Sequence, residues 1–227
     1  LVVTTGTMLY PNNNTFETLS FWFGTGRVFS YDWTQLTDWI YLSHSGQMKG
    51  QFGYGITLFA EDEFYKNILF EDNYGLEISF KKSFSKSISF DIKPKFGTEI
   101  IRVDEPYQAR NTGIALGVEL KPSDEFKLNF RMDQSKSNRF ENDEVVYSDM
   151  IARARFEYQA TTFLNFRLVA QYHRYYDTFD IQPLISYQPG PFSIFYFGTS
   201  RSYDTSFPGW EESYGQIYLK VQKLFSF

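Results

Sequence analysis

The sequence has no cysteine, two histidines and no uncharged apolar run approaching eighteen residues. Without cysteine, the chain has neither a disulfide framework nor a thiolate for catalysis or metal binding. The missing apolar run excludes a transmembrane helix, but it leaves a transmembrane β-barrel open, because a barrel strand needs only alternate residues apolar. The 22 basic and 27 acidic side chains give a net charge of −5. They form no basic stripe, which excludes a nucleic-acid binder.

What the chain does have is aromatic side chains, which make up 20% of its 227 residues. Apolar and polar residues alternate with a period of two from about residue 71 to 173, which is typical of strands. Ile88, Phe90 and Ile92, for example, alternate with Ser89 and Asp91. A helix would place charged and apolar side chains on every face, so the pattern predicts successive β-strands.

Short and long connections alternate along the chain. The short ones are residues 82–86, 122–125, 159–162 and 188–191. The long ones, rich in Asp, Glu, Asn and Ser, are residues 60–70, 97–110, 133–146, 174–179 and 201–211. Tight turns at one end and long polar loops at the other are typical of an outer-membrane barrel. The sequence therefore predicts an all-β, antiparallel, up-and-down transmembrane β-barrel of about 12 strands, or the last 12 strands of a larger barrel, with residues 1–227 as a single domain.

One face of the predicted barrel is apolar and the opposite face is charged, with basic residues concentrated between about residues 125 and 173. We expect the following side chains to face the lumen: Lys127, Arg131, Arg153, Arg155, Glu157 and Arg167. Charges of mixed sign on neighbouring strands form cross-strand pairs and hold water in a lumen. Two hypotheses fit them. One is a polar channel whose Arg-rich wall favours anionic or sugar solutes, and the other is a ladder of charges with a purely structural role.

The two histidines are the starting point for an enzymatic hypothesis. His44 follows Ser43, and His173 precedes Asp177 and Asp180. A barrel hydrolase needs a nucleophile, a base and an orienting group within hydrogen-bond reach. Neither neighbourhood shows a motif, so an outer-membrane barrel hydrolase is kept as an alternative.

Acidic residues crowd one predicted loop, where Glu61, Asp62 and Glu63 precede Glu71 and Asp72. Oxygen ligands at this density can bind Ca²⁺. The twelve-residue spacing of an EF-hand loop is missing, so the first three are weak metal candidates and a solvated loop is the preferred interpretation. We predict no metal and no cofactor.

The chain ends in the strand-like segment YGQIYLKVQKLFSF. This segment resembles the C-terminal signal that the barrel-assembly machinery reads in Gram-negative outer-membrane proteins, with Phe225 and Phe227 in the places of its aromatic residues. Gln222 stands where a glycine is usual. The resemblance implies that outer-membrane lipid and the assembly machinery are partners of the chain.

A second resemblance rests on residues 152–204, which read ARARFEYQATTFLNFRLVAQYHRYYDTFDIQPLISYQPGPFSIFYFGTSRSYD. An Arg-rich strand, a short turn, the LNFRLVAQY strand, the PLISYQPGP turn and the FYFG strand precede the closing YLKVQKLFSF. From about Trp39 to Phe227 the chain resembles the C-terminal barrel region of a family of Gram-negative surface proteins. In that family an N-terminal carbohydrate-binding module, similar to the family 9 type, precedes a large barrel of uncharacterised function. Members are much longer, so the resemblance implies that this chain is the C-terminal part of a longer protein.

Together these observations predict a protein of the Gram-negative outer membrane. The expected role is a channel or surface component for the uptake or handling of glycans or other polar solutes. Glycans and other surface proteins are the further partners that the resemblance implies. The first alternative is a structural membrane anchor for an N-terminal binding module, and the second is the barrel hydrolase.

Overall fold

The computed structural model describes residues 1–206 and 208–223. The regular structure of these residues is β-strand. The strands are β1 Val2–Leu9, β2 Phe16–Phe29, β3 Gln35–Met48, β4 Phe52–Tyr65, β5 Ile68–Ser83, β6 Ile88–Ile101, β7 Tyr107–Leu120, β8 Phe126–Arg139, β9 Val145–Gln159, β10 Leu164–His173, β11 Thr178–Gly190, β12 Ser193–Asp204 and β13 Glu211–Lys223. No helix long and apolar enough to cross a membrane occurs among these residues.

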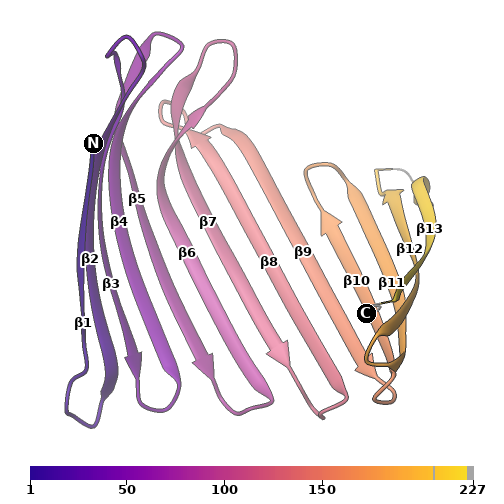
Figure 1. Ribbon diagram of the computed structural model, residues 1–227. Coiled ribbons are helices and arrows are strands. Elements are labelled where there is room, and N and C mark those ends of the chain that lie inside the picture. The colour runs from indigo at the N-terminus through magenta and orange to yellow at the C-terminus, as the bar shows by residue number, and fades with distance from the viewer. Residues whose placement is uncertain (207, 224–227) are drawn as a thin grey trace. The chain divides into compact units, whose positions relative to one another are not determined.

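Strands that follow one another in the chain are neighbours in the sheet, from β1 through to β13 (Figure 1). The pairings from β1 to β5 and from β9 to β13 are antiparallel. This confirms the predicted all-β, antiparallel, up-and-down arrangement.

The strand count differs from the predicted twelve, because the described residues hold thirteen strands. The additional one is β1, whose segment VVTTGTML has apolar residues side by side at both of its ends. A strand without clean alternation gives no period-two signal. Pairing with β2 defines it, from Val2 opposite Gly26 to Leu9 opposite Leu19.

The predicted long loops are also wrong in part, because much of their length is strand. The loop expected over residues 60–70 is a two-residue turn, Lys66 and Asn67, between the ends of β4 and β5. Both turn residues have positive φ, 49° and 62°, as a type I′ hairpin turn requires. Charged residues beyond the apolar part of a strand look like loop in sequence, yet here Glu63 pairs with Phe70 across the hairpin.

The described chain divides into two compact units. Unit 1 comprises Leu1–Ser83, Asp91–Ala115 and Gln134–Ser148. Unit 2 comprises Phe84–Phe90, Leu116–Asp133 and Asp149–Phe227. Strands β1 to β5 therefore belong to unit 1 and β10 to β13 to unit 2.

Each unit has two chemically different faces, which follow from strand alternation and register. In unit 1 the apolar face is formed by cross-strand neighbours that include Phe23, Leu42, Leu58 and Leu76. The residues next to these in each strand point to the polar face of unit 1. There Ser43 is opposite Thr57, and Thr57 is opposite Glu77. In unit 2 the apolar face includes Phe156, Leu168, Pro183, Ile185, Phe197 and Leu219. The polar face of unit 2 includes Arg153, Arg155, Glu157, Arg167 and Leu184.

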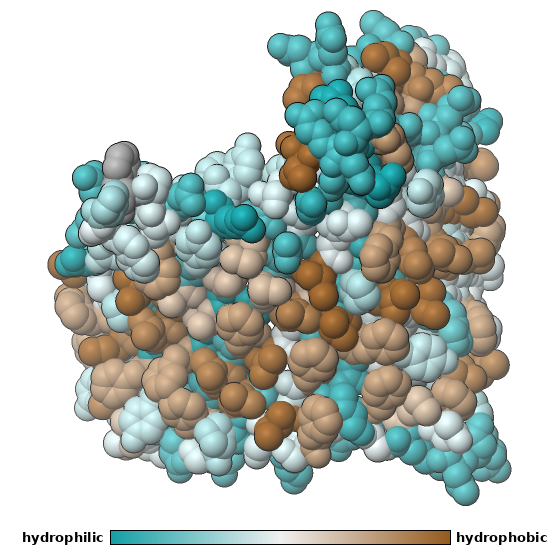
Figure 2. Space-filling model, turned by 180° about the vertical axis from the view of Figure 1, so that it is seen from behind, coloured by the Kyte–Doolittle hydropathy of each residue, from teal (hydrophilic) through white to brown (hydrophobic). Residues whose placement is uncertain are grey.

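The apolar faces are exposed instead of packed. Leu42 and Leu58 are 52% and 49% exposed, and in the described chain the buried hydrophobic residues are Phe70, Ile100, Ala109, Val169 and Leu184. Figure 2 shows apolar side chains gathered over the strands, with hydrophilic ones towards the strand ends. An exposed apolar surface of this kind marks contact with another apolar phase, because soluble monomers rarely expose large contiguous apolar patches.

Candidate functional site

The six side chains that the sequence places in the lumen lie on strands β8, β9 and β10 in unit 2, and we call them the charged wall: Lys127, Arg131, Arg153, Arg155, Glu157 and Arg167. On β9 and β10 the register brings Glu157 directly opposite Arg167, and Arg155 opposite Val169. Lys127 and Arg131 share one face of β8 because they lie four residues apart on a strand. The neighbours on β9 and β10 are thus brought together as a cross-strand set of both signs.

Four of the six residues of the charged wall take part in local ion pairs. Lys127 Nζ lies 2.9 Å from Glu119 Oε2, and Arg131 Nε lies 3.6 Å from Asp133 Oδ2. Arg155 Nε donates to Glu157 Oε1 at 3.0 Å. These pairs are the ladder of charges that one of the two sequence hypotheses predicts.

Two arginines of the charged wall stand outside this ladder. Arg153 and Arg167 make no ion pair with any described residue, and Arg153 lies opposite Gln171. The buried Arg167 Nε has no hydrogen-bond partner among these residues either. Since Glu157 bonds Arg155, two guanidinium groups on neighbouring strands keep their positive charge uncompensated.

A second feature is a cavity on the polar face of unit 1, with a volume of about 300 Å³. Its lining comes from four strands, β4 to β7. On the polar face it comprises Thr57, Phe59, Glu77, Lys95, Glu99 and Asn111, and Tyr74, Leu76, Phe96 and Thr98 also contribute. Lys95 Nζ lies 3.2 Å from Glu77 Oε2. We call it the inner cavity.

Two of the polar groups in the inner cavity are fixed by serine hydroxyls. The fully buried Ser137 donates its hydroxyl to Glu99 Oε1. Asn111 Nδ2 donates to Ser135 Oγ and to Ser137 Oγ, each at 3.1 Å. The carboxylate and the amide are therefore held in place by neighbouring side chains of unit 1.

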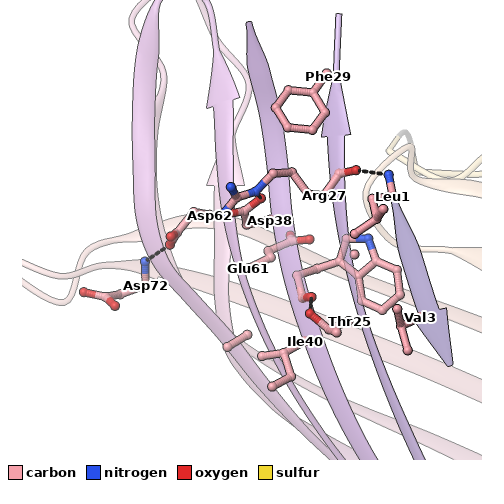
Figure 3. Close-up of a pocket in the computed structure, with 13 residues that line it drawn as sticks. Leu1, Val3, Thr25, Arg27, Phe29, Asp38, Ile40, Glu61, Asp62 and Asp72 are labelled. Atoms are coloured by element: carbon pink, nitrogen blue, oxygen red, sulfur yellow. Dashed lines mark hydrogen bonds and ion pairs between the residues drawn. The ribbon is translucent and has the colours of Figure 1, made fainter. Parts of the chain in front are cut away.

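A third feature is a larger pocket of about 740 Å³ near the ends of β2 to β5 in unit 1, which we call the rim pocket (Figure 3). Arg27 and Asp38 form a two-bonded ion pair there, with N to O distances of 2.6 and 2.5 Å. Asp62 accepts a hydrogen bond from the backbone N–H of Asp72 at 2.9 Å. Because the Arg27 guanidinium is paired with Asp38, the remaining carboxylates of Glu61, Asp62 and Asp72 make the rim pocket acidic.

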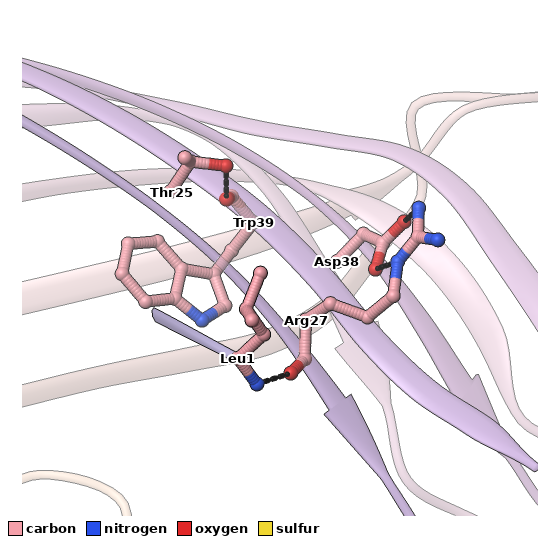
Figure 4. A network of polar contacts seen from close by, with 5 residues as sticks. All are labelled: Leu1, Thr25, Arg27, Asp38 and Trp39. Carbon is pink, nitrogen blue, oxygen red and sulfur yellow. Dashed lines mark hydrogen bonds and ion pairs between the residues drawn. The ribbon is translucent and has the colours of Figure 1, made fainter. Parts of the chain in front are cut away.

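Backbone contacts complete this part of the sheet (Figure 4). Thr25 Oγ1 donates to the carbonyl oxygen of Trp39 at 3.0 Å. The indole of Trp39 lies over Gly26, where an added Cβ would come within 2.6 Å of ring atoms. The glycine thus lets a large ring lie flat on the adjacent strand.

The weak metal candidates do not form one site. Glu61, Asp62 and Glu63 lie on β4, where alternation sends Asp62 to the face opposite its two neighbours. Glu63 forms an ion pair with Arg102, and Arg102 Nη2 lies 2.8 Å from both carboxylate oxygens of Glu63. Among residues 1–206 and 208–223, no group of three or more His, Asp or Glu side chains is placed to hold a metal ion.

The two histidines have partners that local sequence does not reveal. Both ring nitrogens of His44 are engaged, with the carbonyl of Ser20 at 3.1 Å and the hydroxyl of Tyr54 at 2.9 Å. His173 Nε2 lies 2.8 Å from Asp149 Oδ2, and Asp149 also accepts from the backbone N–H of Tyr175 at 3.1 Å. Asp149 stands on β9, so cross-strand register and not sequence proximity creates this pair.

The sequence also missed the role of Phe59 and Asn111 in the inner cavity. Strand prediction places Phe59 in a loop-flanking position, and Asn111 reads as an ordinary polar residue. The available signal is the glycine at position 75, directly opposite Phe59 in the register. The predicted assembly signal, Phe225 and Phe227, lies outside the described residues.

Comparisons with known proteins return two channels among solved structures. The structure titled "CymD monoaromatic hydrocarbon channel" is 9% identical with a TM-score of 0.39, over 99% of this chain and 87% of that chain. The NanC porin structure is 10% identical with a TM-score of 0.35, over 89% of this chain and 98% of that chain. No protein-family model matches the chain, and no match is found among the curated proteins. Similarity at this level transfers no functional detail to this chain.

Proposed function

We propose that the chain forms the wall of an aqueous channel in the outer membrane of a Gram-negative bacterium. In this proposal the apolar faces contact lipid and the polar faces contact the solute. The channel passes polar solutes, glycans among them, and prefers anions over cations.

Membrane contact is supported by the exposed apolar faces. Leucines and phenylalanines of these faces, such as Leu42, Leu58 and Phe197, are about half exposed, and in water this surface would favour aggregation. Aromatic side chains at strand ends add to the argument, since Tyr158, Phe163, Tyr187 and Phe192 are exposed around two turns of unit 2. Amphipathic rings favour the headgroup region of a bilayer.

The anion preference rests on one observation, the two arginines without ion-pair partners. Arg153 and Arg167 lie on adjacent strands among otherwise neutralised charges. A passage lined by fixed charge of one sign raises the local concentration of solutes of the opposite sign. The ladder of ion pairs contributes little to this field, because each pair is close to neutral at a distance.

The test is reconstitution of the folded protein into planar bilayers with a salt gradient. We expect single-channel current steps and a reversal potential on the anion-selective side. Arg153→Gln combined with Arg167→Gln should move the reversal potential towards zero. The matched control is Arg201→Gln, which removes an arginine paired to Glu212 at 3.1 Å and located on the apolar face of unit 2.

Absence of single-channel events would overturn the channel proposal and favour the alternative, a membrane anchor for an N-terminal binding module. Anion selectivity that survives the double substitution would leave a channel but remove its assigned selectivity residues. The family resemblance remains a proposal, and an upstream carbohydrate-binding module in the complete reading frame would support it. Lipid or peptide hydrolysis that disappears in His173→Ala would favour the hydrolase alternative instead.

A further inference from the structure

The inner cavity contains an exposed aromatic ring, Phe59, on the polar face of unit 1, where Tyr41 is its cross-strand neighbour. Phe59 is 42% exposed, although it lies among Ser43, Thr57 and Glu77 on the polar face of unit 1. Exposed rings on a polar surface have a cost in hydration that a ligand removes when it covers them. The exposed ring is therefore the first indication of a binding site.

The strand beneath the ring is shaped to receive it. Gly75 lies directly opposite Phe59, and a Cβ added at this glycine would overlap the ring itself. The ring consequently lies flat against β5, with its other flat side free of the strand. Gly97 continues the same glycine floor on β6 and also lines the inner cavity.

The polar groups around the ring identify the chemistry of the ligand. Glu77 and Glu99 supply carboxylate oxygens and Lys95 supplies N–H donors. Asn111 supplies its amide oxygen as an acceptor, because its Nδ2 already donates to Ser135 and Ser137. A hydroxyl group both donates and accepts, so a polyhydroxylated molecule satisfies donors and acceptors together. Two carboxylates against one ammonium leave the inner cavity with an excess negative charge, which disfavours an anionic ligand.

An aromatic hydrocarbon fits Phe59 and the apolar lining of Tyr74, Leu76 and Phe96, but not the charged and amide groups of this site. It would cover the carboxylates, the ammonium and the amide without replacing their hydrogen bonds to water. Burying a polar group without a hydrogen-bond partner is unfavourable, and burying a charged group is more so. A sugar ring has C–H groups on one flat side for Phe59 and hydroxyl groups at its edge for the polar residues.

We infer that the inner cavity is a binding subsite for one unit of a neutral sugar, stacked on Phe59 and hydrogen-bonded by Glu99 and Asn111. The volume of about 300 Å³ lies at the lower end of small-molecule sites and suits a single ring. The inference deepens the proposed function and rests on it, because it names a solute class for the polar face. It involves unit 1 alone, whereas the anion preference involves the charged wall of unit 2.

The test is titration calorimetry of the folded protein in detergent with neutral trisaccharides of glucose, galactose and mannose, and with toluene. We expect saturable binding of at least one trisaccharide. Phe59→Ala should weaken it by about tenfold or more, which corresponds to about 1.4 kcal/mol. Phe59→Tyr keeps the ring and should retain binding, and Phe197→Ala, an exposed ring on the apolar face, is the matched control.

The outcomes separate this inference from the channel proposal. No saturable binding of any trisaccharide would overturn the sugar subsite, even if the protein conducts ions. Saturable toluene binding that depends on Phe59, without sugar binding, would overturn the ligand class. Trisaccharide binding that is unchanged in a folded Phe59→Ala variant would remove the subsite from the inner cavity. Sugar binding without single-channel events would refute the channel and retain a sugar-binding surface.

Discussion

The contact between Phe59 and Gly75 supports a quantitative prediction. The perturbation is Gly75→Ala, because the atoms nearest to an added Cβ are all in the Phe59 ring. Gly75 is buried and its backbone φ lies outside the left-handed region, so the cost comes from the ring and not from backbone strain. Moving the ring off β5 would expose the strand beneath it.

The magnitude follows from two opposing effects. Inserting a methyl group into an occupied site costs about 1–3 kcal/mol. Alanine stabilises a strand by about 0.5–1 kcal/mol relative to glycine, because an alanine residue loses less conformational freedom on folding. We expect Gly75→Ala to lower the free energy of unfolding by about 1–2 kcal/mol. In a Phe59→Ala background the overlap is gone, and the same substitution should be neutral or slightly stabilising.

The assay is urea unfolding of the protein in lipid vesicles, followed by tryptophan fluorescence, for the two single variants and the double variant. The coupling free energy of the cycle isolates the ring contact. Gly97→Ala is the control, because an added Cβ there meets the backbone of Tyr74 and Gly75, which Phe59→Ala does not relieve. An equal cost of Gly75→Ala in both backgrounds would refute the reasoning and the flat orientation of the ring.

Three further predictions concern polar contacts. Ser30→Ala should raise the pKa of Asp32, a carboxyl in a turn, towards 3.8. The hydrogen bond from the Ser30 hydroxyl is the main cause that holds this pKa below 3.8, and an NMR titration would measure the change. Arg27→Gln should change the free energy of unfolding by less than about 1 kcal/mol, because its ion pair with Asp38 is largely exposed to solvent, and a larger loss in urea would contradict this. Asp149→Ala should lower the free energy of unfolding by about 1–3 kcal/mol in the same assay. The buried carboxylate bonds His173 on β10 and the backbone N–H of Tyr175, and an unchanged urea midpoint would argue against the pair with His173.

The regular part of the fold was predictable because its physics is local. Alternation of apolar and polar residues locates β5 to β10 well, and the two faces of β9 and β10 are those that the pattern indicates. The ends of the strands were not predictable in the same way. Residues such as Glu61 and Glu63 carry charge and resemble loop, yet cross-strand hydrogen bonds extend β4 to Tyr65.

The site was predictable as a set of residue types but not as an arrangement. Alternation places Arg153 and Arg167 on the polar face, but the sequence does not reveal that Glu157 forms its ion pair with Arg155. Register between distant strands decides such pairings, and it also brings Asp149 to His173. One residue of slip would change every partner, so the inner cavity is invisible before the register is known.

The central claim is that the polar face contacts water while the apolar face contacts lipid, and the absence of native cysteine makes it directly measurable. Single cysteines placed along β10 in the reconstituted protein can be exposed to a charged, membrane-impermeant thiol reagent. We expect fast modification, with a change in conductance, at positions 165, 167 and 171. We expect protection at positions 166, 168 and 170, whose side chains belong to the apolar face. Equal reactivity at both sets of positions, or protection of the first set, would contradict this claim.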